Sequence, residues 1–469
     1  MENTNTKLQN NFEQNTQLID KLLRADESFD LLSRDIEINK RKARLYMIDG
    51  LVKDTVMGKM MIFFFGIKDD SFFESPDAFL RNCVPYTEAN LERDPNVIVQ
   101  NILSGIAALF VEGFDSAIML DTRTYPQRET SEPDNDKVMR GSKDGFVETI
   151  ISNIALMRRR IRDANFTVKP FSVSTTSKAD VVLCYMDNKV DKKLLKSISD
   201  RIKNAKAESL AMNQQSLLEA IYPRKWYNPF PKIKYTERPD AAAANAIKGN
   251  IIILVDNSPS ALILPTSIFD ITEEADDYYF PPLTGSYLKI ARYLIFLTAI
   301  FVTPLWLLMK QNPSFVPDSL QFIIADNQYN IPIFWQLIIL EIAIDGLRLA
   351  ALNTPTSLSG TMGIIGAIAL SEFTIDVGWF STEAILYMAF VTIAGFSQPN
   401  YELTYCAKFI RMFLLTLTVI FNLWGFIAGL IITLILLLTN KTVSGKSYLY
   451  PLIPFNGKAF LSKVLRLRS

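Results

Sequence analysis

Long runs of apolar residues, which begin at about position 288, constrain the fold of this chain more than any other feature. The segments 288–309 and 412–438 each exceed the roughly 20 apolar residues that a helix needs to cross a bilayer. Up to about residue 287 the sequence is instead rich in charge, as in a soluble protein. We therefore expect an α/β or α+β soluble N-terminal region followed by a polytopic α-helical membrane domain.

The composition excludes several classes of function. The chain has 49 Lys and Arg against 49 Asp and Glu, so it lacks the basic surplus that a nucleic-acid partner demands. It contains no histidine, which excludes Ser-His-Asp and Cys-His catalytic sites and histidine-based zinc sites. Its three cysteines lie far apart and form no CxxC pair. We expect neither an enzyme nor a bound cofactor or metal.

Alternating strand and helix patterns organise the soluble region. Strands are predicted at 43–50, 116–120, 180–186, 250–255 and 261–264, and helices at 192–205 and 241–246. Residues 11–32 have the spacing of a surface or interaction helix. The predicted domains are a polar extension at 1–35, soluble subdomains at 36–165 and 166–287, a membrane domain at 288–440 and a basic tail at 441–469.

Both ends of the chain are expected on the cytosolic side of a membrane. Residues 1–17 are polar and do not resemble a signal peptide, and the tail after Asn440 carries basic residues without an acid. The number of crossings is then even. Four crossings with 330–352 as a re-entrant or interfacial helix satisfy this, whereas six would need the last run to fold back. A single tilted or kinked helix is the favoured prediction for 412–438, with Asn422 bonded to a neighbouring helix.

A dense group of charged residues and glycines lies between 132 and 162. Asp144 is a candidate cap for the helix that follows, and arginines fall near its C-terminus, where cations oppose the helix dipole. A solvated helix end, a basic face at a subunit interface and contact with anionic lipid headgroups are the three interpretations. The candidate interface residues are Glu132, Arg140, Gly141, Gly145, Arg158, Arg159, Arg160 and Arg162.

The hydrophobic segment 330–352 is unusual because it carries Glu341, Asp345 and Arg348. Glu341 and Asp345 are four residues apart, so they share one helix face, and Arg348 lies on nearly the same stripe. Ionisable groups among apolar residues are costly and normally face a bundle interior or water. The segment is either the lining of an ion pathway or an amphipathic helix in the headgroup layer.

The next segment, 358–370, is rich in small residues. Gly360, Gly363 and Gly366 favour tight packing of helices, and a narrow pore lined by small residues is the alternative. Glu372 borders the segment and could belong to an acidic vestibule that concentrates monovalent cations. These four residues, together with the three charged residues of 330–352, form the candidate ion pathway.

Several motifs resemble the GerA family of spore germination proteins. They are Glu132-Pro133, Val138-Met139-Arg140-Gly141, Gly145-Phe146-Val147-Glu148, Arg158-Arg159-Arg160-Ile161-Arg162, Asp277-Tyr278-Tyr279 and Pro399-Asn400-Tyr401-Glu402-Leu403. The resemblance covers about residues 29–452. Within the family, the runs 121–128 and 140–149 look like the stage V sporulation branch, whereas receptor A subunits read closer to Arg-Gly-Pro-Arg-Glu-Gly-Phe in the second run.

The resemblance implies a place in the spore inner membrane and a homo-oligomeric ring whose membrane helices form an ion-conducting path. For the stage V branch it implies amplification of germination, together with a small membrane partner and other germination proteins. The alternatives are a nutrient receptor A subunit, a non-conducting membrane scaffold and a secondary transporter. A transporter would predict inverted repeats, which the sequence does not show convincingly.

Overall fold

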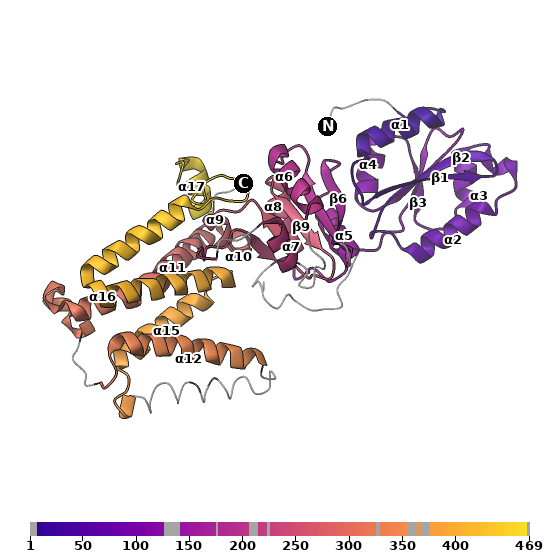
Figure 1. Ribbon diagram of the computed structural model, residues 1–469. Coiled ribbons are helices and arrows are strands. Elements are labelled where there is room, and N and C mark those ends of the chain that lie inside the picture. Colours follow the sequence, from indigo (N-terminus) through magenta and orange to yellow (C-terminus); the bar gives the residue numbers. More distant parts are fainter. Residues whose placement is uncertain are drawn as a thin grey trace. The chain divides into compact units, whose positions relative to one another are not determined.

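The computed structural model describes residues 7–125, 141–174, 177–205, 214–222, 226–324, 329–353, 363, 366 and 375–466. The chain divides into two compact units (Figure 1). The soluble unit comprises Met1–Arg224 and Tyr235–Pro265, and the helical unit comprises Lys225–Lys234 and Thr266–Ser469. Residues 266–287 therefore belong with the helices, although the sequence analysis assigned them to the second soluble subdomain.

The first half of the soluble unit is a five-stranded antiparallel sheet with helices on both faces. Its strands occur in the order β1-β2-β4-β5-β3. The elements are α1 (Phe12–Leu23), β1 (Leu31–Ile38), β2 (Arg41–Ile48), α2 (Asp54–Phe65), α3 (Pro76–Cys83), β3 (Ala89–Glu92), α4 (Pro95–Leu103), β4 (Ala107–Val111) and β5 (Ala117–Leu120). Helices α2 and α3 cover one face, and α1 and α4 cover the other.

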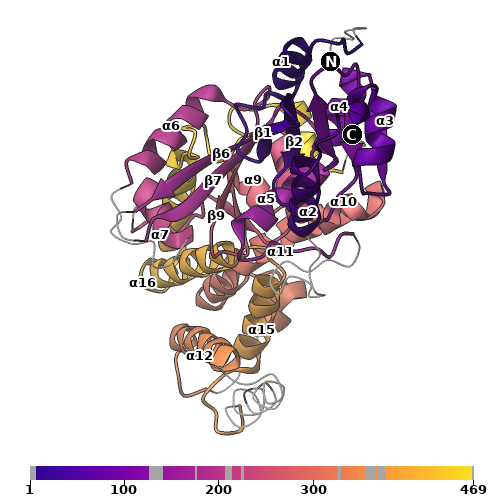
Figure 2. The ribbon, with the colours of Figure 1, turned by 90° about the vertical axis from the view of Figure 1, so that its right-hand side faces the viewer.

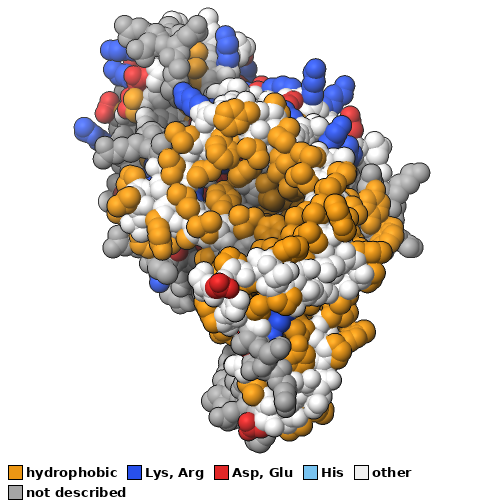
Figure 3. Space-filling view, turned by 90° about the vertical axis from the view of Figure 1, so that its left-hand side faces the viewer, with side chains coloured by type: hydrophobic (Ala, Val, Ile, Leu, Met, Phe, Trp, Pro, Cys, Tyr) orange, Lys and Arg blue, Asp and Glu red, His pale blue; other side chains and the backbone are white. Residues whose placement is uncertain are grey.

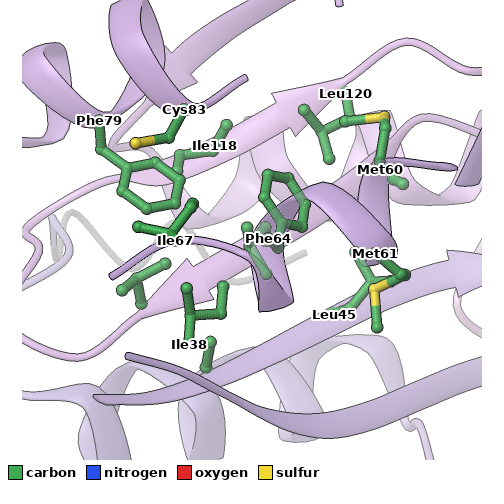
Figure 4. Packing of buried hydrophobic residues seen from close by; sticks show 14 of the residues in the cluster. Ile38, Leu45, Met60, Met61, Phe64, Ile67, Phe79, Cys83, Ile118 and Leu120 are labelled. Atoms are coloured by element: carbon green, nitrogen blue, oxygen red, sulfur yellow. The ribbon is translucent and has the colours of Figure 1, made fainter. Parts of the chain in front are cut away.

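Alternate residues of each strand supply the two cores of this sheet, as the period of two in a strand requires. Leu45 of β2 and Ile118 of β5 share one core with Phe64 and Phe79, which come from α2 and α3 (Figure 4). Tyr46, next to Leu45, faces the opposite core with α1 and α4. Because both faces are covered, the fully buried strands β4 and β5 are continuous apolar runs.

The second half of the soluble unit repeats the first. Its sheet has the order β6-β7-β9-β10-β8, which is the same topology. Figure 2 shows β6, β7 and β9 side by side. The elements are α5 (Ile150–Arg160), β6 (Phe166–Val173), β7 (Ala179–Met186), α6 (Lys192–Lys203), α7 (Gln214–Ile221), β8 (Lys234–Thr236), α8 (Pro239–Ile247), β9 (Ile251–Val255) and β10 (Ala261–Leu264). Helices α5 and α8 pack together on this sheet, as α1 and α4 do on the first.

The repeat is readable in the sequence, although the sequence analysis missed it. Pro95 and Pro239 each begin a helix, and Gly105 and Gly249 each follow that helix with φ of +99° and +100°. The offset along the sequence from Pro95 to Pro239 equals the offset from Gly105 to Gly249. The strands that follow, β4 and β9 and then β5 and β10, are related by the same offset. Glycine is favoured at both turns because it adopts positive φ without steric cost.

A buried ion pair joins the two halves of the soluble unit. Arg158, at the end of α5, donates to both carboxylate oxygens of Asp30, at 2.6 and 2.9 Å, and to the carbonyl oxygen of Phe166. Neither charged side chain exceeds 1% exposure. The Ser28 hydroxyl bridges the same network, donating to Asp30 and accepting from the backbone of Val168. The guanidinium of Arg158 therefore makes its hydrogen bonds and its ion pair within the soluble unit.

Three predictions about this region need correction. Arg158 is not a solvated helix end and is not available to another subunit, because it is buried against Asp30. Asp144 does not cap α5; it pairs with Arg160 at 3.0 Å, and Thr149 precedes the helix without a side-chain cap. The helical pattern at 11–32 ends early, because α1 stops at Leu23 and β1 begins at Leu31.

Asp30→Ala should destabilise the soluble unit by about 3–5 kcal/mol, because it leaves Arg158 buried and unpaired. The loss is measured by pulse proteolysis of the detergent-purified chain in urea. Glu13→Ala is the matched control, since it breaks an exposed pair with Lys42 that contributes at most about 1 kcal/mol. Equal effects of the two substitutions would contradict the assignment.

The helical unit begins with short helices α9 (Ile268–Ile271) and α10 (Asp276–Tyr279). The longer helices are α11 (Pro282–Gln311), α12 (Ile333–Asn353), α15 (Thr382–Phe396) and α16 (Tyr401–Thr439), with α17 (Gly457–Val464) near the end. Among the described residues, α11 and α16 are long and apolar enough to cross a membrane, and α15 is a shorter apolar helix. Figure 3 shows a broad face dominated by hydrophobic side chains. The large apolar residues Phe421, Trp424 and Ile431 of α16 are exposed and offer surface suited to lipid.

The last apolar run folds back on itself, so the prediction of one tilted or kinked helix is wrong. At Asn422 the backbone is non-helical, with φ of 52° and ψ of −134°, and α16 consists of arms 401–421 and 423–439 (Figure 1). Gly429 of the second arm is packed against Leu414 of the first. These residues would be about 22 Å apart in a continuous helix. The fold-back is the arrangement that six crossings would need.

Asn422 also makes the contact with a neighbouring helix that the sequence analysis predicted. Its side-chain amide exchanges two hydrogen bonds with that of Asn312, at the end of α11, at 2.5 and 3.1 Å. The pair satisfies polar groups of both residues at the turn.

Asn422→Leu should lower the thermal midpoint of the helical unit, because leucine resists positive φ at a cost of about 1–3 kcal/mol and loses both bonds to Asn312. Tryptophan fluorescence measures this unit alone, since all five tryptophans belong to it: Trp226, Trp306, Trp335, Trp379 and Trp424. Asn422→Gly tolerates the backbone and should lose less stability. A leucine variant as stable as the wild type would argue against the fold-back.

Candidate functional site

The cations at the start of α11 are neutralised by the acidic segment before it. Arg292 donates to Asp277 at 2.7 and 3.1 Å and to Glu274 at 2.6 Å, and Lys289 lies 3.3 Å from Glu273. Asp277 is fully buried and Arg292 nearly so. Both cations are paired with carboxylates, so the cluster fixes the start of the first long apolar helix.

A second cluster of ionisable groups lies among the mostly apolar helices α11, α12 and α16. Glu341 accepts from the Arg411 Nε at 2.7 Å and is also paired with the Arg411 Nη2. Lys408 pairs with Asp345 and lies 3.4 Å from the second oxygen of Glu341. Glu341 and Arg411 are 3% and 4% exposed, so the pair is shielded from solvent by the protein itself.

Helical spacing on both sides explains why four charges meet. Glu341 and Asp345 are four residues apart on α12, and Lys408 and Arg411 are three apart on α16. Each pair therefore presents one face to the other helix. The shared face of the two acids was predicted from the sequence, and their common contact with Lys408 confirms it. Their cationic partners were missed, although the spacing of Lys408 and Arg411 was a readable signal.

Arg348, the third charged residue predicted in this segment, lines the same cavity without joining an ion pair among the described residues. Its guanidinium lies 4.7 Å from the ring centre of Phe396 and 5.6 Å from that of Tyr405. The cavity measures about 40 Å³ and is also lined by Gln398, between α15 and α16, which the sequence analysis did not single out as a site residue.

The small-residue segment is described only in part. Gly366 is buried against Leu347 of α12, whose side chain a Cβ on Gly366 would strike, so this glycine serves tight packing. Gly363 is exposed and has no neighbour within 4 Å of a Cβ. Gly360 and Glu372 lie outside the described residues, and a pore lined by these residues stays a prediction.

The other candidate interface residues are mostly engaged within the soluble unit. Arg160 binds Ser142 and Asp144, and Arg159 lies 4.5 Å from the centre of the Tyr125 ring. Gly145 is buried, whereas Gly141 and Arg162 are exposed. Glu132 and Arg140 lie outside the described residues. A subunit interface at Gly141 and Arg162 stays a prediction.

The arrangement gives no sign of thiol chemistry in the soluble unit. Burial raises the pKa of the Cys83 thiol to about 11, and it also raises the pKa of Cys184. Both thiols therefore remain protonated and poorly nucleophilic at neutral pH. Within the described part of the chain, no group of three or more acidic or cysteine side chains is placed to hold a metal ion.

Comparisons with known proteins agree over nearly the whole chain. Residues 17–469 match the model of the family described as "Bacillus/Clostridium GerA spore germination protein". Stage V sporulation protein AF of Bacillus subtilis (strain 168) is 36% identical over 94% of this chain and 89% of its own length. Spore germination protein A1 of the same organism is 28% identical over 79% of this chain and 77% of its own length.

One solved structure was also similar. It is the N-terminal domain of the A subunit of the Bacillus megaterium spore germinant receptor GerK3, with a TM-score of 0.39 and 22% identity, and the match covers 55% of this chain and 96% of that chain. The family assignment rests on sequence alone, through the family match and the 36% identity. This chain belongs to the GerA family of spore germination proteins.

Proposed function

We propose that the chain is a subunit of an oligomeric ion channel in the spore inner membrane, where it amplifies the germination response. The observation that carries the proposal is the group of five ionisable side chains around one cavity of an apolar helical unit: Glu341, Asp345, Arg348, Lys408 and Arg411. Glu341 and Arg411 are buried and the other three are partly exposed, and ionisable groups among apolar helices usually mark an ion or substrate pathway. The similarity to Stage V sporulation protein AF, higher than to protein A1, supports the amplifying role over nutrient sensing.

The ion pairs of Glu341 and Asp345 restrict the role that these carboxylates would have in the channel. Glu341 and Asp345 are each compensated by a cation of α16, so they do not act as free carboxylate ligands for a permeant ion. Glu341, Asp345, Lys408 and Arg411 form instead a wall of ion pairs without net charge. The path for monovalent cations runs past the α12 side of this wall in the oligomer. The Glu341–Arg411 pair keeps the wall from becoming positive, which would repel cations.

The proposed arrangement places the soluble unit and the basic tail on the spore core side. A small membrane partner and other germination proteins would couple the channel to the upstream signal. A nutrient receptor A subunit and a non-conducting scaffold remain the rival functions, and reconstitution separates the scaffold from the channel.

Glu341→Gln should reduce the K⁺ conductance of liposomes that contain the purified chain by roughly tenfold or more. The reason is that Arg411 then faces the path uncompensated, and unit charges about 8 Å apart at an effective dielectric constant of 20 repel by about 2 kcal/mol. Conductance is measured as tracer efflux at matched protein content and oligomer size. Lys441→Gln, which removes an exposed cation outside the cavity, is the control and should conduct normally.

Two outcomes would overturn the proposal. If the wild-type chain inserts into liposomes as an oligomer but conducts no ions, the non-conducting scaffold is the function that fits. Saturable uptake that depends on an ion gradient would instead indicate a transporter.

A further inference from the structure

The cavity between α12, α15 and α16 is not balanced in charge. It is lined by three cations and two carboxylates. The carboxylates of Glu341 and Asp345 are already engaged by Arg411 and Lys408. Arg348 is left without a carboxylate partner among the described residues, so the cavity carries an excess of one positive charge. Arg348 is partly buried, and a charge that is shielded from water without a partner of opposite charge is disfavoured.

The aromatic neighbours of Arg348 do not remove this excess. Phe396 and Tyr405 attract the guanidinium through their ring faces, but a ring carries no net charge. The Arg348 Nε is buried and donates to no atom of the described chain. One strong donor of a charged group is therefore unsatisfied at the wall of the cavity.

A second side chain at the same cavity is also unsatisfied. Gln398 is 9% exposed, and neither its amide nitrogen nor its amide oxygen has a hydrogen-bond partner in the described residues. A buried polar side chain with both ends unsatisfied indicates a bound group that the protein atoms do not supply. The Gln398 nitrogen and the Arg348 guanidinium are both donors, so an acceptor suits them.

Size restricts the class of ligand. A volume of about 40 Å³ is room for one to three water-sized groups and excludes an amino acid or a lipid headgroup. Water could satisfy the donors and the amide oxygen, but it would leave the charge of Arg348 uncompensated. A cation would meet a cavity that is already positive.

We propose that this cavity binds one small monovalent anion of the size of chloride, held by Arg348 and by the amide nitrogen of Gln398, with water on the amide oxygen. The anion links α12 to the segment between α15 and α16 and completes the charge balance of the cluster. Binding does not depend on conduction, so the inference stands or falls separately from the proposed channel.

The test uses the detergent-purified full chain, with tryptophan fluorescence reporting the helical unit. At constant Na⁺ concentration and ionic strength, replacing gluconate by chloride or bromide should raise the thermal midpoint saturably by a few degrees. Direct binding of radioactive chloride should saturate at about one ion per chain. Sulfate, which is larger and divalent, should not substitute.

Arg348→Gln and Gln398→Leu should each abolish the saturable shift, and Arg348→Lys should keep it at weaker affinity. Lys441→Gln, which removes an exposed cation outside the cavity, should retain the full shift. The tracer measurement on the wild type needs no variant, so a variant that fails to fold does not spoil the test.

Three results would overturn the proposal. The first is absence of saturable chloride binding to the wild type, which would leave only water in the cavity. The second is stabilisation that follows the cation rather than the anion. The third is an Arg348→Gln chain that loses its oligomeric state while the wild type shows no anion response, because Arg348 would then contact a carboxylate of another copy.

Discussion

The helical unit depends on the ion pair between Glu341 and Arg411. These two side chains are almost fully buried and connect α12 to α16, and Arg411 also donates to the backbone of α11 at Ala299. Each charge is tolerable only in the presence of the other, because a single buried charge would face apolar side chains alone. The pair thus fixes which faces of three helices meet. Hydrophobic contacts alone would allow several relative rotations of these helices.

The other features of this unit follow from that fixed contact. Lys408, one turn before Arg411, is brought to Asp345, and Arg348 lines the same cavity. The fold-back at Asn422 returns the chain to the first arm of α16, where Gly429 allows close approach to Leu414. Both proposals depend on how these five charges are paired. The ion pairs of Glu341 and Asp345 form the wall of the proposed channel, and Arg348, which joins neither pair, is the proposed ligand of the anion.

The sequence predicted what is encoded locally and missed what depends on distant partners. The strands at 180–186 and 261–264 lie within one residue of β7 and β10, because apolar runs between turn residues are sufficient signals. The common face of Glu341 and Asp345 followed from helical period. The pairing of Arg158 with Asp30 could not be assigned, since nothing local tells which of many charges a buried residue meets, whereas the spacing of Lys408 and Arg411 was a usable signal. The fold-back was missed because one asparagine in an apolar run does not reveal its φ, whereas the repeat of Gly105 at Gly249 was readable and overlooked.

A double-mutant cycle between Glu341 and Arg411 tests the central contact most directly. Glu341→Gln, Arg411→Met and the double variant are compared by denaturant unfolding of the helical unit, followed by tryptophan fluorescence in detergent. The account predicts that each single variant loses more stability than the double variant, with a coupling free energy of about 2–3 kcal/mol. Losses that simply add would contradict it, because the two charges would then not depend on each other.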